Sequence, residues 1–234
     1  MRLRLFVAGA IAIIIAALGY SISRAPCFQL VGEITCRVET DRKLVALTFD
    51  DGPTSEGLDS ILPVLERHGV RATFFLVGEE MERRPGEAER LVRAGHELGN
   101  HTYTHRRMLL RWPSTYGEEI VRTAALLRGA GQRAPSLLRP PYGKRLIGFP
   151  LAAEKAGYRM ITWDVEEDYG ATTARLYATR ITDKVRPGSI VLMHPMYGNH
   201  ALVRDALPII IDDLQRRGFR LVTVSELLKA QDAA

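Results

Sequence analysis

The stretch from Leu44 to Pro53 reads Leu-Val-Ala-Leu-Thr-Phe-Asp-Asp-Gly-Pro, an apolar run that stops on two adjacent carboxylates and a turn. Its length and apolar content predict a buried strand, which Gly52 and Pro53 end. Two neighbouring carboxylates at a strand end repel each other, so Asp50 and Asp51 require a metal ion, an arginine or a raised pKa. An ordinary acidic turn is the competing interpretation, because Asp, Gly and Pro favour turns.

Beyond Lys43, apolar runs of strand type alternate with helical patterns, which is typical of an α/β fold with a largely parallel sheet. The expected strands are 44–50, 71–77, 97–99, 136–139, 158–162, 189–193 and 220–224, and the expected helices are 58–68, 86–94, 114–127, 149–156, 174–185, 202–217 and 225–230. We predict a distorted, incomplete (β/α) barrel of about seven strands, in a single domain over residues 43–234. The polar motifs fall where apolar runs end, and folds of this class place their active sites there.

The composition is that of an ordinary globular protein. The chain has 234 residues, of which 46% are hydrophobic and 25% charged, enough for one sizeable core. Its formal net charge is +5, but the lysines and arginines are scattered without a dense run. The sequence therefore predicts no nucleic-acid partner, and we interpret the charge as a solvated surface suited to an anionic envelope.

The N-terminal segment, residues 1–24, differs in kind from the rest. Arg2 and Arg4 precede an apolar segment from Leu5 to Tyr20, the pattern of a secretion signal peptide or an uncleaved signal anchor. No clean Ala-x-Ala cleavage site follows, which favours the anchor. We expect the remainder to be exported, to the periplasm or the outer face of the cytoplasmic membrane, with a membrane contact through residues 1–24 if they are not cleaved.

The chain has two cysteines, Cys27 and Cys36, in the linker 25–42 between the apolar segment and the first strand. In an oxidising compartment this spacing closes a small loop, so we predict a disulfide between them. It would be peripheral to any chemistry.

Two histidines four residues apart, His101 and His105, form the second polar motif. On a helical turn this spacing puts both imidazoles on one face, so that they can reach one ion. With Asp51 they would supply three ligands and leave a position for water, the arrangement of a catalytic metal site. Zinc, cobalt, nickel and manganese all remain open, since such ligands bind several divalent ions. By itself the spacing is also that of two surface histidines.

Three further motifs end apolar runs. Arg139 precedes a Pro-Pro turn and could pair with the carboxylate that does not bind metal, although it could equally be a surface arginine. His194 closes the run 189–193 and suits a general acid, although a lone histidine there is often structural. The acid-rich segment 163–169 also follows a strand. The other histidines, His68, His96 and His200, are assigned no role in the site.

Taken together, these motifs resemble those of the polysaccharide deacetylases, carbohydrate esterases that remove N-acetyl groups from chitin-type and peptidoglycan sugars. The resemblance covers about residues 43–228 and rests on Thr-Phe-Asp-Asp-Gly-Pro, His-Thr-x-x-His, Arg-Pro-Pro-Tyr and Leu-Met-His in the family order. It implies that Asp50 is the catalytic base, that Asp51, His101 and His105 bind a divalent metal, usually zinc, that Arg139 steadies Asp50, and that His194 is the acid.

One motif departs from the family pattern. The family usually has Asp-x-x-Asp-Trp after the strand, with the first aspartate orienting the catalytic histidine. Here the loop from Trp163 to Tyr169 is one residue shorter, with Tyr169 in place of the tryptophan. We assign the orienting role to Glu166, with Asp164 and Asp168 as alternatives.

The resemblance thus implies a metal-dependent hydrolase that removes N-acetyl groups from an acylated glycan of the cell envelope and releases acetate. The backbone N–H of Tyr142 is the expected second donor to the oxyanion. Two alternatives remain open: an inactive exported carbohydrate-binding protein of the same fold, and an amidohydrolase that acts on a non-sugar amide.

Overall fold

β2 (Leu44–Asp50) is the central strand of a parallel sheet, and all seven of its residues are buried. The computed structural model describes residues 2–134, 136–166 and 170–231. In it β2 pairs in parallel with β3 (Thr73–Leu76), β8 (Ile190–Met193) and β9 (Arg220–Val222). A strand covered on both faces reads as a continuous apolar run, so the strand predicted over 44–50 is confirmed with its limits.

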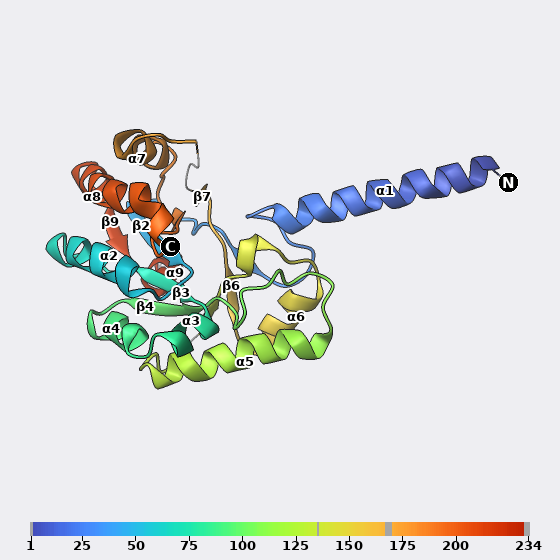
Figure 1. Cartoon of the computed structure of the whole chain (residues 1–234). Helices are drawn as coiled ribbons and strands as arrows, with labels where there is room; N and C mark the ends of the chain where they lie inside the picture. The colour runs from blue at the N-terminus through green and yellow to red at the C-terminus, as the bar shows by residue number, and fades with distance from the viewer. Residues whose placement is uncertain (1, 135, 167–169, 232–234) are drawn as a thin grey trace.

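The sheet curls into a half-barrel with helices packed around its outside (Figure 1). Across it the strands follow the order β1 (Ile34–Thr35), β6 (Arg159–Ile161), β5 (Leu137–Leu138), β4 (Glu97–Asn100), β3, β2, β8 and β7 (Val165–Glu166), with β9 as a further partner of β2. The predicted α/β class and incomplete barrel are confirmed. Among the described residues the sheet has nine strands rather than about seven, because β1 and β7, two residues each, add to the expected strands.

The alternation of side chains along β2 separates the core from the site. Val45, Leu47 and Phe49 belong to the main hydrophobic cluster beneath the helices, whereas Ala46 belongs to a second cluster. Asp50 follows Ala46 at an even spacing and therefore points to the inner face of the half-barrel.

The helices that cover the sheet form where the sequence has apolar faces of helical period. α2 (Ser55–Arg67) is capped by Thr54, whose Oγ1 accepts the Gly57 N–H at 3.1 Å. The remaining helices of the domain are α3 (Gly78–Arg83), α4 (Glu87–Arg93), α5 (Pro113–Gly129), α6 (Gly148–Lys155), α7 (Ala174–Thr182), α8 (Ala201–Arg216) and α9 (Val224–Leu228), with the short 3₁₀ turns η1 (Pro141–Gly143) and η2 (Gly198–His200). All the expected helices are present within a few residues of their predicted limits, and α3 is an addition.

The N-terminal segment forms a single helix, α1 (Arg2–Arg24), that projects from the domain (Figure 1). Over the part of the chain that the structure describes, none of the helices combines the length and the apolar character needed to cross a bilayer.

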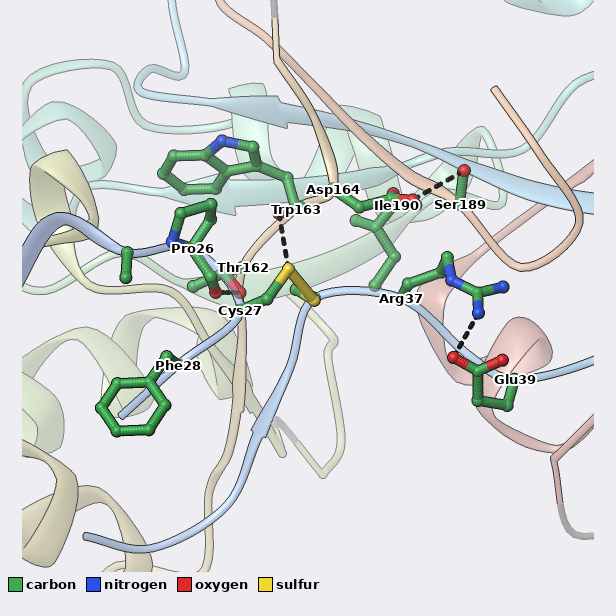
Figure 2. Close-up of a disulfide and its surroundings, with 12 residues drawn as sticks. Pro26, Cys27, Phe28, Arg37, Glu39, Thr162, Trp163, Asp164, Ser189 and Ile190 are labelled. Carbon is green, nitrogen blue, oxygen red and sulfur yellow. Dashed lines mark hydrogen bonds and ion pairs between the residues drawn. A yellow bond between two sulfur atoms is a disulfide. The ribbon is translucent and has the colours of Figure 1, made fainter. Parts of the chain in front are cut away.

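The segment 25–42 is tied to the sheet at several points (Figure 2). Cys27 and Cys36, the pair expected to be joined, form a disulfide with Cα atoms 5.2 Å apart. β1 pairs with β6, and the Thr162 Oγ1 donates to the Pro26 carbonyl at 2.6 Å. This stretch is therefore part of the half-barrel rather than a free linker.

Candidate active site

A cavity of about 450 Å³ opens where β2 ends. Its lining comprises Tyr20, Asp50, Asp51, His101, His105, Arg107, Tyr142, Lys144, Trp163, Glu166, Leu192, His194 and His200. Because the carboxyl ends of parallel strands meet on one side of a barrel, side chains from β2, β4, β5, β7 and β8 or the loops that follow them converge there.

Asp51, His101 and His105 form a compact group of potential ligands. The Asp51 Oδ1 lies 3.1 Å from the His105 Nε2 and 3.7 Å from the His101 Nε2, and one ligand atom of each residue lies within 4.8 Å of the others. This set of two imidazoles and one carboxylate fits a divalent ion that keeps a further position for water.

The hydrogen bonding of His101 suits a ligand. Its Nδ1–H donates to the Arg139 carbonyl at 2.9 Å, which leaves the Nε2 lone pair facing Asp51. Burial lowers the pKa of His101 well below its ordinary value, so the imidazole is neutral. A neutral imidazole with a fixed tautomer is the form that binds a metal ion.

His101 and His105 do not lie on a helical turn. β4 ends at Asn100, and both Thr102 and His105 have a left-handed backbone, with φ of 67° and 56°, which interrupts any helical repeat. The Asn100 Oδ1 accepts the Thr102 N–H at 2.9 Å, and the Asn100 Nδ2 donates to the Ile120 carbonyl. The two imidazoles converge, with ring centres 4.9 Å apart, through this folded loop instead.

Glu119 of α5 holds the same loop, and sequence analysis missed it. Its Oε2 accepts the N–H groups of Tyr103 and Thr104, both at 2.8 Å, and its Oε1 accepts the Thr104 hydroxyl at 2.5 Å. The side chain is buried. A signal was present, because Glu119 lies in the apolar stripe of α5 beside Ile120, and a carboxylate on a buried face needs donors.

Asp50 is paired with Arg139 beneath the cavity. The Arg139 Nη1 donates to the Asp50 Oδ1 at 2.6 Å and to the Thr48 hydroxyl at 2.8 Å, and its Nη2 donates to the Thr162 carbonyl. Burial lowers the pKa of Arg139, and the neighbouring Asp50 opposes that shift. The second Asp50 oxygen, Oδ2, lies 3.7 Å from the His101 Nε2 and so points toward the ligand group.

His194 and His200 lie on the wall of the cavity beyond β8. The His200 Nδ1–H donates to the His194 carbonyl, and the two rings meet edge to face with centres 6.4 Å apart. His200 thus belongs to the cavity, contrary to the sequence analysis. His96 has no part in it: its Nδ1 accepts the Ala72 N–H, and burial lowers its pKa to about 4.

The three acidic candidates for orienting His194 have different positions. Glu166 lines the cavity on β7. Asp164 instead accepts the Ser189 hydroxyl at 3.0 Å and the Ile190 N–H at 2.9 Å at the start of β8 (Figure 2), so its carboxylate is engaged outside the site. Asp168 lies outside the described residues.

Tyr142 lies on η1 at the mouth of the cavity. Its backbone is left-handed, with φ of 57°, and its exposed ring lies 4.8 Å from the His105 ring. A non-glycine residue persists in this conformation only where its surroundings determine it. The turn therefore has a fixed position beside the ligand group.

Comparison with known proteins identifies the family. The family model of the polysaccharide deacetylase domain matches residues 37–161. The chain belongs to the polysaccharide deacetylase family. The matched range contains Asp50, Asp51, both histidines of the ligand group and Arg139, whereas His194 follows it.

Individual members of the family are similar over most of this chain. A peptidoglycan-N-acetylglucosamine deacetylase of Bacillus cereus is 36% identical over 187 residues, which is 79% of this chain and 68% of that protein. The solved structure of the Bc1960 peptidoglycan N-acetylglucosamine deacetylase superimposes with a TM-score of 0.79 at 33% identity, over 84% of this chain and 92% of that one.

A related structure shows that the fold does not guarantee activity. BA3943, a CE4 family pseudoenzyme from Bacillus anthracis, superimposes with the same TM-score of 0.79 at 29% identity, over 86% of this chain and 70% of that one. An argument for activity must therefore rest on the site itself.

Proposed function

We propose that this protein is a metal-dependent hydrolase that removes N-acetyl groups from an N-acetylated glycan of the cell envelope, leaving a free amine and releasing acetate. The observation that carries the proposal is the arrangement at the end of β2, where the arginine-paired Asp50 adjoins the ligand group of Asp51, His101 and His105. The similarity to deacetylases of peptidoglycan supports the choice of an acetylated glycan as substrate.

Asp51, His101 and His105 would hold the metal ion through one carboxylate oxygen and two Nε2 atoms. When bound, a divalent ion at such ligands lowers the pKa of a water molecule and makes it a nucleophile at neutral pH. Zinc is our first candidate, because two imidazoles and a carboxylate with an open position are common around catalytic zinc.

Asp50 is the proposed base that takes the proton of the attacking water. Its Oδ1 is engaged by Arg139, so the carboxylate has a fixed orientation, and its Oδ2 points toward the ligand group. General-base catalysis requires this geometry before any matching of pKa values.

His194 is the proposed acid that donates a proton to the departing amine, which is otherwise a poor leaving group. We assign the backbone N–H of Tyr142 to the oxyanion that forms on the acetyl carbonyl. We assign the orienting of His194 to Glu166, which lines the same cavity.

We also propose that residues 1–24 direct export and that the domain acts on the outer side of the cytoplasmic membrane, either anchored or released. The charge pattern of this segment supports export, and so does the Cys27–Cys36 disulfide, since disulfides persist in oxidising compartments.

The test is acetate release by the full chain, after chelation and with added zinc, on peptidoglycan and on chitin oligosaccharides in parallel. Asp50→Asn serves as the matched control, because it removes the base while leaving the proposed ligands in place. Metal-dependent release that the control lacks is the expected result. Tight metal binding without release from either glycan would favour an inactive carbohydrate-binding protein or a different acyl substrate.

A further inference from the structure

The loop of residues 106–112, which we call the docking loop, joins His105 to α5 and reads Arg-Arg-Met-Leu-Leu-Arg-Trp. We infer that this loop docks the protein on a bilayer surface with anionic headgroups, with Leu110 and Trp112 inserted among them. The inference goes beyond the proposed deacetylation and does not depend on it.

Leu110 and Trp112 are the two most exposed large hydrophobic side chains among the described residues, at 93% and 81%. Single exposed apolar residues are ordinary on a protein surface, but two large ones close together at a loop tip mark an interaction site. Leu110 also has a left-handed backbone, with φ of 49°, which leucine rarely adopts.

Leu110 and Trp112 are exposed on an ordered loop, because the inner side of the docking loop packs against the domain. Met108 is buried against Tyr116 and Phe149. The Arg111 N–H donates to the Tyr116 hydroxyl at 2.9 Å, and the Thr115 N–H donates to the Trp112 carbonyl at 3.0 Å. The loop is thus presented on a fixed support, as a binding surface requires.

The charge of the docking loop suits an anionic partner. Arg106, Arg107 and Arg111 are all exposed, and the loop contains no carboxylate. In the described part of the chain, no ion pair joins these arginines to an acidic side chain. Glu119 lies beneath the loop, but it is buried and its carboxylate accepts the hydrogen bonds of Tyr103 and Thr104.

The chemistry favours lipid headgroups over a glycan as the occupant. Sugars bind to aromatic rings and to hydrogen-bonding groups, and Leu110, the more exposed of the two apolar side chains, offers neither. Leucine and tryptophan flanked by arginines are instead the combination that lies at a membrane interface, where the apolar groups insert and the cations meet phosphate.

The position of the docking loop agrees with this partner. Figure 1 shows the loop, in green at the start of α5, on the side of the domain toward which α1 extends. The apolar segment 5–20 that we expect to act in export therefore lies on the same side. Arg107 also lines the active-site cavity, with its guanidinium 5.1 Å from the Tyr142 ring centre, so a docked loop would hold the cavity near the membrane surface.

Tryptophan emission of the full chain tests the inference. The chain has two tryptophans, and Trp163 is only 8% exposed, so a change of emission on binding reports mainly Trp112. With vesicles of phosphatidylcholine and phosphatidylglycerol, we expect the emission to shift to shorter wavelength and to be protected from acrylamide. Since α1 is present in every variant, any lipid contact of its own is common to all of them.

The variants separate the contributions of charge and apolar contact. Each arginine near an anionic surface contributes about fivefold in binding, so Arg106→Gln with Arg111→Gln should weaken the response at limiting lipid roughly 25-fold. Leu110→Ser should also reduce the change of tryptophan emission on adding vesicles. Val121→Ser and Arg128→Gln, exposed changes on α5 away from the loop, are the controls and should leave it intact.

Three results would overturn the inference. The first is an unchanged Trp112 emission with phosphatidylglycerol vesicles, and the second is an equal shift with vesicles of phosphatidylcholine alone. The third is a shift produced by chitin oligosaccharides without vesicles in the Trp163→Phe variant, in which Trp112 is the remaining tryptophan, and it would assign the loop to the glycan. None of these readings depends on acetate release, so failure of the proposed function would be recognised separately.

Discussion

The guanidinium of Arg139 lies 2.6 Å from the Asp50 carboxylate, and both side chains are buried. The pair links the end of β5 to the end of β2, two strands that are separated in the sheet by β3 and β4. Arg139 therefore both orients Asp50 and compensates its charge, and these two effects can be measured apart.

The proposed role of Asp50 as the base predicts the phenotype of Asp50→Asn. Because Asp50 is not among the proposed ligands, the variant should bind metal with the affinity of the wild type. Loss of a general base should lower kcat by about 10²–10⁴-fold. Steady-state acetate release and calorimetric metal titration check the two parts, and normal turnover of the metal-loaded variant would remove Asp50 from this role.

Replacing Arg139 tests the stabilising part of the pair. Arg139→Met leaves Asp50 buried without its partner, and breaking a buried pair in this way costs about 3–5 kcal/mol of unfolding free energy. The double variant Asp50→Asn with Arg139→Met removes both charges and should recover part of that loss. Urea unfolding at neutral pH measures the free energy of unfolding of the single and the double variant. A single variant within about 1 kcal/mol of the wild type would contradict the view that the pair is energetically coupled.

Glu119→Gln tests whether Glu119 supports the loop of residues 101–105, which carries two of the proposed metal ligands. The two carboxylate oxygens of Glu119 accept hydrogen bonds from the Thr104 hydroxyl and from two backbone N–H groups. In glutamine one of these oxygens is replaced by an NH₂ group, which donates and cannot accept. The loop that carries His105 should therefore lose its fixed position. We expect metal affinity to fall about 10–100-fold, as for other residues that orient ligands. The matched control is Glu118→Gln, an exposed neighbour on α5. Unchanged affinity in competition with a chelator would restrict Glu119 to a purely structural role.

Burial of His96 predicts a pH dependence of stability. Its pKa is about 4 in the folded protein, below the ordinary 6.5, so the folded state holds a neutral imidazole while the unfolded state takes up a proton. The free energy of unfolding is therefore unaffected by protonation of His96 above pH 6.5 and decreases as the pH falls toward 4, by up to about 3 kcal/mol. His96→Gln keeps an acceptor for the Ala72 N–H and should make the free energy of unfolding less dependent on pH between 4 and 6.5. Equal slopes for the variant and the wild type would show that His96 does not titrate as expected.

The sequence by itself determined the strand 44–50, the α/β class, the incomplete barrel and the convergence of the polar motifs at the strand ends. Apolar runs, their period and their limits report burial directly, because a strand covered on both faces must be apolar throughout. The expected pairing of Cys27 with Cys36 likewise needed only their spacing and the expected compartment.

Only the tertiary structure decided how the proposed ligands are held and which acidic residues face the site. The convergence of His101 and His105 depends on left-handed backbone at Thr102 and His105 and on Glu119 from another element, which no helical period expresses. Asp164 and Glu166 are two residues apart, yet one binds the start of β8 and the other lines the cavity. Local sequence reports which face is buried, but the partner of a polar side chain is set by residues that are distant in the chain and adjacent in space.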